Sequence, residues 1–344
     1  MYSMCCVSER THVMLLLLRL TLAFAGSSWR RVASMPDGRL NHCVVGRRTT
    51  VYSIGGYNFP PPSYEDTLLY LDTTANVWMY SSNNMSTSRD SFACAAHGDA
   101  IYAIGGESAN YPFTLASVER LNVSEDAAGA ARGWELAPTL LQPRQGHSAA
   151  VVGDTLFAAG GICANGTVLA SVERLGPHAD RWETVPPMQL ERYYFAVAAV
   201  DQTLYAFGGL GKGHAASGPL ASAEAFDVQH AVWRSLAPLP EARERMAVAV
   251  SDGNIFLLGG CTTSTSPTGD PCDSTLSSVL RFQPPSASTG HSALGTWSTI
   301  PSLPQPNAWL GATALSGTIY AVGGGLTYGR NDTFSFSLVR TVMR

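Results

Sequence analysis

The sequence predicts an all-β fold, made of six similar units stacked around a common axis. A short apolar run followed by a pair of glycines occurs six times, at intervals of 48 to 64 residues. A tryptophan lies 26 or 27 residues before each pair, and an arginine lies 16 residues before five of them. Three residue types held in register over six copies indicate an internal repeat, whose period is that of a ring or solenoid.

The repeat positions can be read directly from the sequence. The glycine pairs begin at Gly55, Gly105, Gly160, Gly208, Gly259 and Gly323. The tryptophans are Trp29, Trp78, Trp134, Trp182, Trp233 and Trp297, and Trp309 lies outside the series. The arginines are Arg39, Arg89, Arg144, Arg192 and Arg243, with Asn307 at the sixth position.

Each unit is predicted to contain four strands, in an order that the third copy shows clearly. AAVVG (149–153) gives the first strand, TLFAAGG (155–161) the second and ASVERL (170–175) the third, and the fourth carries Trp182. The glycine pair ends the second strand, because a backbone without Cβ atoms can turn tightly and let a neighbour approach closely. One such unit cannot bury both of its faces, so the units must stack around a central axis.

The composition agrees with a large ring of short strands. Charged residues make up 14% and hydrophobic residues 45% of the 344-residue chain, which also has 33 glycines and 20 prolines. This excludes global disorder and disfavours long surface helices. A net charge of -4 gives no reason to expect nucleic acid as a partner. A chain of this length would usually form two or more domains, but a ring grows by adding units.

The repeats resemble those of the kelch family, over roughly residues 27–344. SVERLGPHADRWETVPPMQLER (171–192) and SAEAFDVQHAVWRSLAPLPEAR (222–243) are most similar to repeats of BTB-kelch proteins. Six motifs imply a six-bladed β-propeller. Blade 1 departs from the family pattern, with Leu69 where blades 2 to 4 have a glutamate, and blade 5 has a long insertion after Gly260.

The two ends of the repeat region are expected to complete one blade together. The last repeat stops after TFSFSLVR (333–340), which we predict to be its third strand, and has no tryptophan strand. The region begins with WRRVASMP (29–36), a tryptophan strand without a preceding glycine pair. The N-terminal strand is therefore predicted to complete the last blade, which closes the ring and hides its unpaired edges.

Residues 1–25 lie outside the repeat, and residues 26–344 are predicted to form the propeller. The segment has an apolar stretch that ends in Ala23-Phe24-Ala25, as in a secretory signal, but Arg19 interrupts it. A transit peptide or a disordered extension is the rival interpretation, so a cytoplasmic and a secreted location both remain open. The stretch is too short for an integral membrane span.

Cysteines and glycosylation sequons bear on the same choice. We expect Cys43 and Cys94 to be packed thiols in first strands, and Cys261 and Cys272 to be able to staple the blade 5 insertion in an oxidising compartment. Cys163 is then left over, which mildly disfavours secretion. Sequons in predicted turns or loops occur at Asn84, Asn122, Asn165 and Asn331.

No catalytic or cofactor motif accompanies the repeat. GGLGKG (208–213) lacks the spacing and the Ser/Thr of a phosphate-binding loop, and neither a zinc-type His/Cys cluster nor Gly-x-Ser-x-Gly is present. Some relatives of kelch proteins are enzymes, such as galactose oxidase and sialic-acid mutarotases, but their ligand sets are not found here. We therefore expect no enzyme activity, no cofactor and no metal. His42 and His147 share one repeat position and are expected to be structural.

The candidate binding face is the rim formed by the loops that follow the glycine pairs and the tryptophan strands. In BTB-kelch substrate receptors the recurring arginine and the position two residues later supply much of a peptide pocket. The resemblance implies the following binding residues: Arg89, Arg144, Arg192, Tyr194, Arg243, Arg245 and Trp309. Guanidinium groups grip carboxylates and aromatic rings form rigid anchors, which suits an acidic peptide.

The recurring arginines also have a purely architectural interpretation, as residues that hold neighbouring loops. Tyr194, Arg245 and Trp309 do not recur, so they are the sharper functional candidates. The loops after the glycine pairs add aromatic residues at Tyr57, Phe59, Tyr64, Tyr111, Phe113 and Tyr328.

The predicted function is a protein-interaction module that binds a protein or peptide partner on this rim. By analogy with BTB-kelch proteins it would be a substrate-recognition adaptor in ubiquitin ligation, although no BTB domain is found in the chain. The alternative is a secreted carbohydrate-active or ligand-binding propeller, which the signal-like segment and the sequons favour.

Overall fold

The computed structural model describes most of the chain beyond residue 28. The described residues are 29–58, 63–123, 133–213, 218–262, 272, 274–285, 294–328, 335–338 and 342–343, with side chains up to residue 325. The signal-like segment, Phe59 and the sequon at Asn331 therefore lie outside the described residues.

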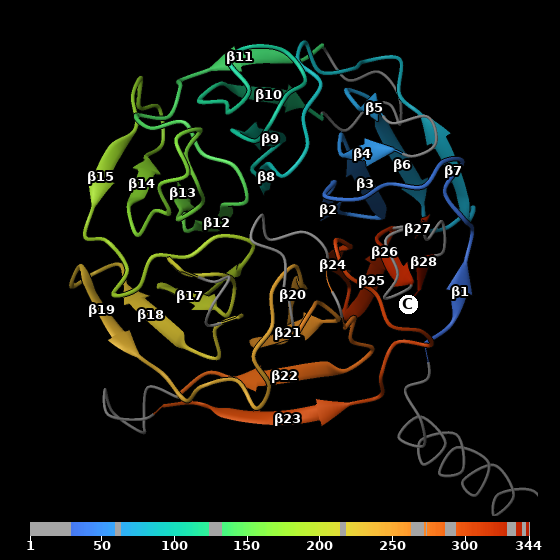
Figure 1. Cartoon of the computed structure of the whole chain (residues 1–344). Helices are drawn as coiled ribbons and strands as arrows, with labels where there is room; N and C mark the ends of the chain where they lie inside the picture. The colour runs from blue at the N-terminus through green and yellow to red at the C-terminus, as the bar shows by residue number, and fades with distance from the viewer. Residues whose placement is uncertain are drawn as a thin grey trace, which may run out of the picture.

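Six four-stranded antiparallel sheets are arranged as blades around a central axis (Figure 1). The innermost strands are β2 (Cys43–Arg47), β8 (Ala93–His97), β12 (Ser148–Val152), β16 (Ala196–Val200), β20 (Ala247–Ser251) and β24 (Gly311–Leu315). The second strands are β3 (Thr50–Ile54), β9 (Ala100–Ile104), β13 (Thr155–Ala159), β17 (Thr203–Phe207), β21 (Asn254–Leu258) and β25 (Thr318–Val322).

The outer half of each blade carries the third and fourth strands. The third strands are β6 (Leu68–Asp72), β10 (Val118–Asn122), β14 (Val172–Leu175), β18 (Ala223–Asp227), β22 (Val279–Gln283) and β28 (Val342–Met343). The fourth strands are β7 (Val77–Tyr80), β11 (Glu135–Ala137), β15 (Glu183–Val185), β19 (Val232–Ser235), β23 (Thr296–Ile300) and β1 (Arg31–Val32). The predicted all-β six-bladed propeller is confirmed.

Two short hairpins add to the blades. One pairs β4 (Tyr57–Asn58) with β5 (Ser63–Tyr64), and the other pairs β26 (Gly325–Tyr328) with β27 (Ser335–Leu338). The second hairpin corrects the sequence prediction, because 333–340 was expected to be the third strand of blade 6. Its described part pairs with β26 instead, and β28 takes the third position beside β25.

The ring closes through its N-terminal strand, as predicted. In blade 6, β1 pairs with β28, with Arg31 opposite Met343 and Val32 opposite Val342. The sheet order is β1-β28-β25-β24, so the first described strand forms the outer edge of the last blade (Figure 1).

The glycine pairs hold neighbouring blades together. Gly105 and Gly106 have φ of +57° and +101°, in the region that favours glycine. A Cβ atom on Gly105 would lie 2.7 Å from the backbone oxygen of Arg144, which belongs to the connection into the next blade. The N–H of Gly106 donates to that same oxygen over 2.9 Å. The equivalent bond recurs between all blades, and the bond from Gly324 N to Arg39 O closes the series.

The tryptophans form a second set of bonds between blades, farther from the axis. Each indole N–H donates to a backbone oxygen in the connection that leads into its own blade. The acceptors, from Trp78 round to Trp29, are the oxygens of Ala33, Asn83, Pro138, Pro186, Ala237 and Pro301.

The hydrophobic core lies between blades. In one cluster Ile104 and Val118 of blade 2 pack against Leu156, Ala158 and Trp182 of blade 3, all of them buried. Neighbouring sheets pack face to face, so the apolar side chains of one blade cover the facing side of the next.

Cys43 and Cys94 were expected to be packed thiols, but they form a disulfide. Their Cα atoms lie 5.9 Å apart, and the bond links the innermost strands of blades 1 and 2. Closing a loop of 51 residues constrains the unfolded chain by about 4 kcal/mol in the chain-entropy account. The predicted bridge between Cys261 and Cys272 is present as well.

Within the described part of the chain, no helix has the length and apolar character needed to cross a membrane.

We expect deletion of residues 27–38 to destabilise the whole ring. The deletion removes β1 and the connection that leads from it to Arg39, so β28 loses its outer partner and becomes an exposed sheet edge. Thermal unfolding followed by circular dichroism should show a lower melting temperature for all blades together. A truncated protein that melted like the intact chain would contradict the closure.

Candidate functional site

Each recurring arginine bonds the connection that enters its blade to the strands of that blade, an arrangement that we call the joint. In blade 3, Arg144 Nη1 donates to the backbone oxygens of Gly160 and Ser171, over 2.6 and 3.2 Å. Its Nη2 pairs with Glu173 Oε1 at 2.5 Å. Glu173 also accepts the backbone N–H groups of Leu141 and Gln142. The ion pair thus fixes the connection from the previous blade onto the second and third strands.

The same joint is built differently where the glutamate is missing. Blades 2 and 4 repeat it with Arg89–Glu119 and Arg192–Glu224. In blade 1, Arg39 pairs with Asp37, while in blade 5 Arg243 pairs with Glu241. In blade 6 Asn307 Nδ2 donates to the oxygen of Gly323, which is the bond that Arg Nη1 makes elsewhere.

This arrangement separates the candidate binding residues into two groups. Arg89, Arg144, Arg192 and Arg243 have an exposed fraction of 0% and bond within their blades, so they lie beneath the rim rather than on it. Tyr194, Arg245 and Trp309 lie together at one end of the central channel.

That end of the channel, the neck, is formed by one residue from each blade. Each backbone N–H donates to the carbonyl of the corresponding residue in the preceding blade, over 2.7 to 3.2 Å, so that six bonds form a closed ring. The six neck residues are Asn41, Ser91, Gly146, Tyr194, Arg245 and Trp309.

All six neck residues have left-handed backbone, with φ between 47° and 59°. The reason is local, since the residue before each one bridges to the residue after a glycine pair, as Gln145 does to Ile162. The chain must then turn sharply into the innermost strand. The two loop types therefore do meet on one rim, as the sequence indicated.

The large neck residues form a stack over one half of the ring. A Cβ on Gly146 would lie 3.1 Å from the ring of Tyr194, so that ring covers the glycine. The guanidinium of Arg245 lies 4.1 Å from the centroid of Tyr194 and 5.4 Å from that of Trp309. Both distances are within cation–π range.

Buried partners hold this stack in place. Arg245 Nη1 donates to Glu244 Oε2 over 2.8 Å, and Glu244 is fully buried. Trp309 packs in a cluster with Leu40, Cys261 and Cys272, so the disulfide of blade 5 supports it. Arg245 and Trp309 have exposed fractions of 6% and 5%, whereas Tyr194 is half-buried. Glu244 was not singled out from the sequence, because its repeat position, directly after the recurring arginine, holds different residue types in the six blades.

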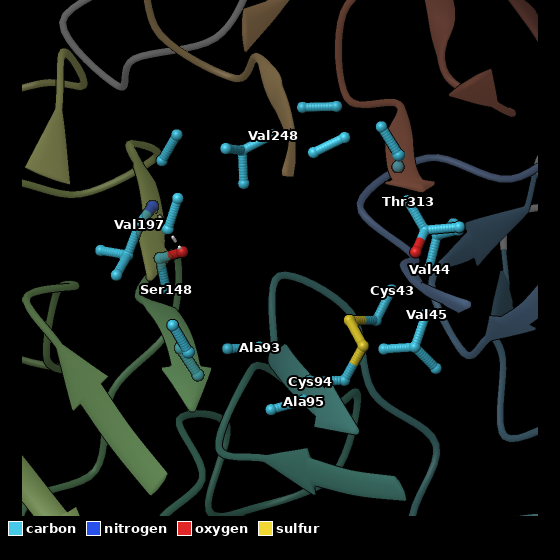
Figure 2. Close-up of a pocket in the computed structure, with 18 of the residues that line it drawn as sticks. Cys43, Val44, Val45, Ala93, Cys94, Ala95, Ser148, Val197, Val248 and Thr313 are labelled. Atoms are coloured by element: carbon cyan, nitrogen blue, oxygen red, sulfur yellow. Dashed lines mark hydrogen bonds between the residues drawn. A yellow bond between two sulfur atoms is a disulfide. The ribbon is translucent and has the colours of Figure 1, made fainter. Parts of the chain in front are cut away.

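Beyond the neck the channel has a volume of about 440 Å³, and the side chains that line it are mostly small and apolar. Figure 2 shows Cys43 and Cys94 bridged in this wall, with Ala93, Val197 and Val248 around the same space. Ser148 Oγ accepts the backbone N–H of Val197 across a blade boundary, as the dashed line in Figure 2 marks.

The two histidines that line the channel are uncharged at neutral pH. Burial, together with the nearby Arg39 guanidinium, lowers the pKa of His42 to about 3. Burial and Arg144 likewise hold the pKa of His147 well below its usual value. Among the described channel residues these are the only histidines or acidic groups, so nothing there would exchange protons near pH ~7. No cluster of three metal-binding side chains occurs in the described part of the chain.

The aromatic residues of the glycine loops form two separate pairs. Tyr57 and Tyr64, in the β4–β5 hairpin, meet edge to face at 5.5 Å between centroids. Tyr111 and Phe113 meet in the same way at 6.2 Å and are exposed by 88% and 56%. Tyr328 is in β26.

The Arg144–Glu173 joint gives a stability prediction. Replacing Arg144 by Met alone should cost about 3–5 kcal/mol, because it leaves the buried Glu173 without a countercharge. The double variant Arg144→Met/Glu173→Leu should recover much of this loss, since blades 1 and 5 carry Leu69 and Leu280 at the glutamate position. Urea unfolding measures both, and a double variant no more stable than the single one would be the contrary result.

The histidines give a pH prediction. The folded-state pKa of His42 is below its unfolded value of 6.5, so the unfolded chain binds the extra proton, and stability present above about pH 6.5 is lost on acidification toward about pH 3. At about pH 4 this amounts to roughly 3 kcal/mol. The variant His42→Phe copies Phe92 of blade 2 and should flatten this slope in urea unfolding. An unchanged slope would show that His42 is not responsible.

Comparison with known proteins agrees with this geometry. The profile of the KLHDC2/KLHL20/DRC7 Kelch-repeats domain matches residues 20–209, and a Kelch motif matches residues 191–240. Kelch-like protein 36 of Rattus norvegicus is 28% identical over 137 residues, which are 39% of this chain and 22% of that protein. Kelch domain-containing protein 8B of Bos taurus is 29% identical over 144 residues, or 39% of each chain.

The matches thus span from about a fifth to two fifths of the length of these curated relatives. A solved structure titled "Structure of YjhT" superposes with a TM-score of 0.68, over 89% of this chain and 99% of that one, at 14% identity. Because the identity is low, this likeness shows the fold alone. With a family profile over more than half its length, a repeat motif beyond it and six blades built on the same joint, the chain belongs to the kelch-repeat family of β-propellers.

Proposed function

We propose that this propeller is a non-enzymatic interaction module that binds a peptide or protein segment at the neck and the surrounding rim. Kelch propellers are generally protein-interaction modules. The observation that carries the proposal for this chain is the choice of residues at three neighbouring neck positions.

Left-handed backbone is unfavourable for bulky side chains, at a cost of about 1–2 kcal/mol each. Gly146 shows which residue the position accepts without cost, and Asn41 tolerates the region well. Tyr194, Arg245 and Trp309 nevertheless stand there side by side. Strained residues of this kind gather at ligand-binding sites, where the surrounding structure holds them in place.

The chemistry of Arg245, a guanidinium held between two aromatic rings, favours an acidic segment. Arg245 is the only charged side chain among the described residues that line the neck, since His42 and His147 are uncharged. Glu244 lies beneath it and fixes the orientation of the guanidinium. A carboxylate from the partner would approach Arg245 between two aromatic rings, the kind of setting in which interface anchors work best.

A second candidate function, a secreted ligand-binding propeller, is favoured by the two disulfides. Such a ligand would enter the channel beyond the neck, whose volume of about 440 Å³ is that of a small-molecule site.

The first proposal can be tested with a random-peptide phage library selected on the intact protein. Selected peptides should be enriched in Asp and Glu. Tyr194→Gly, which removes the ring without straining the backbone, should weaken the best peptide by about tenfold or more. Leu136→Ala, at an 80% exposed position on β11, is the matched control and should have no effect.

The charge is tested separately. Arg245→Gln combined with Glu244→Gln removes both charges together, so no buried charge is left unpaired. Selection on this variant should lose its preference for acidic peptides while the protein keeps its fold, checked by circular dichroism. Peptides that bind the intact protein and both variants equally would refute a site at the neck.

A further inference from the structure

The structure carries four paired cysteines and unevenly exposed sequons, and together these indicate how the chain matures. Of the five described cysteines, only Cys163 is free. The bridge between Cys43 and Cys94 joins two blades, and the one between Cys261 and Cys272 is wholly buried against Trp309. Disulfides of this structural kind form and persist in oxidising compartments and are rare in the cytosol.

The three sequons whose asparagines lie in the described part of the chain are not equivalent. Asn84 follows β7 on the outer rim, and both Asn84 and Ser86 of its NMS sequon are exposed. Asn83 holds the backbone there, because its oxygen accepts the indole N–H of Trp134. The attachment point is thus fixed while the side chain reaches solvent.

Asn165 is the most open of the three. All of Asn165, Gly166 and Thr167 are exposed, and a Cβ placed on Gly166 would meet nothing within 4 Å. Asn165 Oδ1 accepts the N–H of Thr167 over 3.0 Å, so the side-chain oxygen forms a turn. This leaves room for a bulky group on the side-chain nitrogen.

Asn122 differs, and here the sequence prediction of a turn was wrong. It is the last residue of β10, pairs with Ala100 of β9 and is only half-exposed, with its side-chain oxygen buried. A glycan at this position would have to open the end of the strand pair.

We propose that the chain matures in an oxidising secretory compartment and carries N-linked glycans on Asn84 and Asn165 but not on Asn122. In each transfer the side-chain nitrogen bonds to the anomeric carbon of an oligosaccharide carried on a polyprenyl diphosphate. The bond from that carbon to the diphosphate breaks, and the amide proton passes to the transferase. In each disulfide two thiols give two electrons and two protons to the disulfide of a thiol oxidoreductase, which becomes a dithiol.

A glycan on Asn165 would also stand near the neck. Its loop follows the glycine pair of blade 3, and Ile162 at the start of that loop bridges to Gln145, which precedes Gly146. The glycan would flank the small-residue half of the neck and leave the half with Tyr194, Arg245 and Trp309 open.

The test uses tagged full-length protein purified from the cells that naturally express it. The protein is alkylated with N-ethylmaleimide before any reduction, then treated with peptide N-glycosidase F in heavy-oxygen water and mapped by mass spectrometry. We expect linked peptides for Cys43–Cys94 and Cys261–Cys272, and a heavy-oxygen label at Asn84 and Asn165 but not at Asn122.

Variants make the assignment quantitative. Each carries Asn331→Gln, so that the sequon outside the described residues does not contribute. Asn84→Gln and Asn165→Gln should each lower the apparent mass on a gel by that of one glycan. Ser86→Ala and Thr167→Ala, which keep the asparagines, should have the same effect. Asn122→Gln is the matched control and should change nothing.

Two results would overturn the proposal. One is full alkylation of Cys43, Cys94, Cys261 and Cys272 without reduction, which places the chain in a reducing compartment. The other is a bridged protein whose glycan is lost in Asn122→Gln, or which has none at Asn84 and Asn165. Neither result depends on what the neck binds, so the peptide proposal stands or falls separately.

Discussion

A single residue at the start of each blade ties that blade to its own strands and to its neighbour. The backbone oxygen of Arg144 accepts the N–H of Gly106 from the blade before, while its guanidinium bonds the oxygen of Gly160 in its own blade. In blade 6 Asn307 performs both tasks with a shorter side chain. Burying a guanidinium is costly, and the carbonyl groups and glutamate around it offset that cost. The arginine and glycine positions of the repeat are therefore two halves of one joint.

This joint also explains why the neck can vary. Because the joint fixes the backbone on either side, the residue two positions later is held in left-handed conformation whatever its side chain. Glycine and asparagine fit it readily, and Tyr194, Arg245 and Trp309 are tolerated because a closed ring of hydrogen bonds holds them. The joint residue and the proposed binding position thus lie two residues apart in the same connection, one buried and one facing the channel end.

The sequence predicted the blades and the ring closure because both follow from periodicity. Recurrence already favoured an architectural role for Arg243 over Arg245, but the sequence still kept both as candidate binding residues, since spacing alone does not show which side chain the glycine turns enclose. The bridge between Cys43 and Cys94 was missed for a related reason. The two cysteines occupy different repeat positions: Cys43 directly follows His42, whereas Cys94 lies two residues after Phe92, the counterpart of His42 in blade 2. In addition, the innermost strands of adjacent blades belong to different sheets, so no strand register predicts which of their residues meet. The third strand of blade 6 was misplaced because Ser335–Leu338 has strand-like alternation but finds its partner in β26.

The pairing of Arg31 with Met343 has a consequence for how the molecule is made. Synthesis proceeds from the N-terminus, so β1 emerges before all the other described strands and its partner β28 emerges after them. Until then the growing chain is an incomplete ring, and the apolar face of blade 1 that packs against blade 6 stays uncovered. Contacts of such long sequence separation form slowly and leave apolar surface exposed in the meantime. The apolar contact between blades 6 and 1 therefore forms late, after the facing surfaces of both blades have been exposed to solvent.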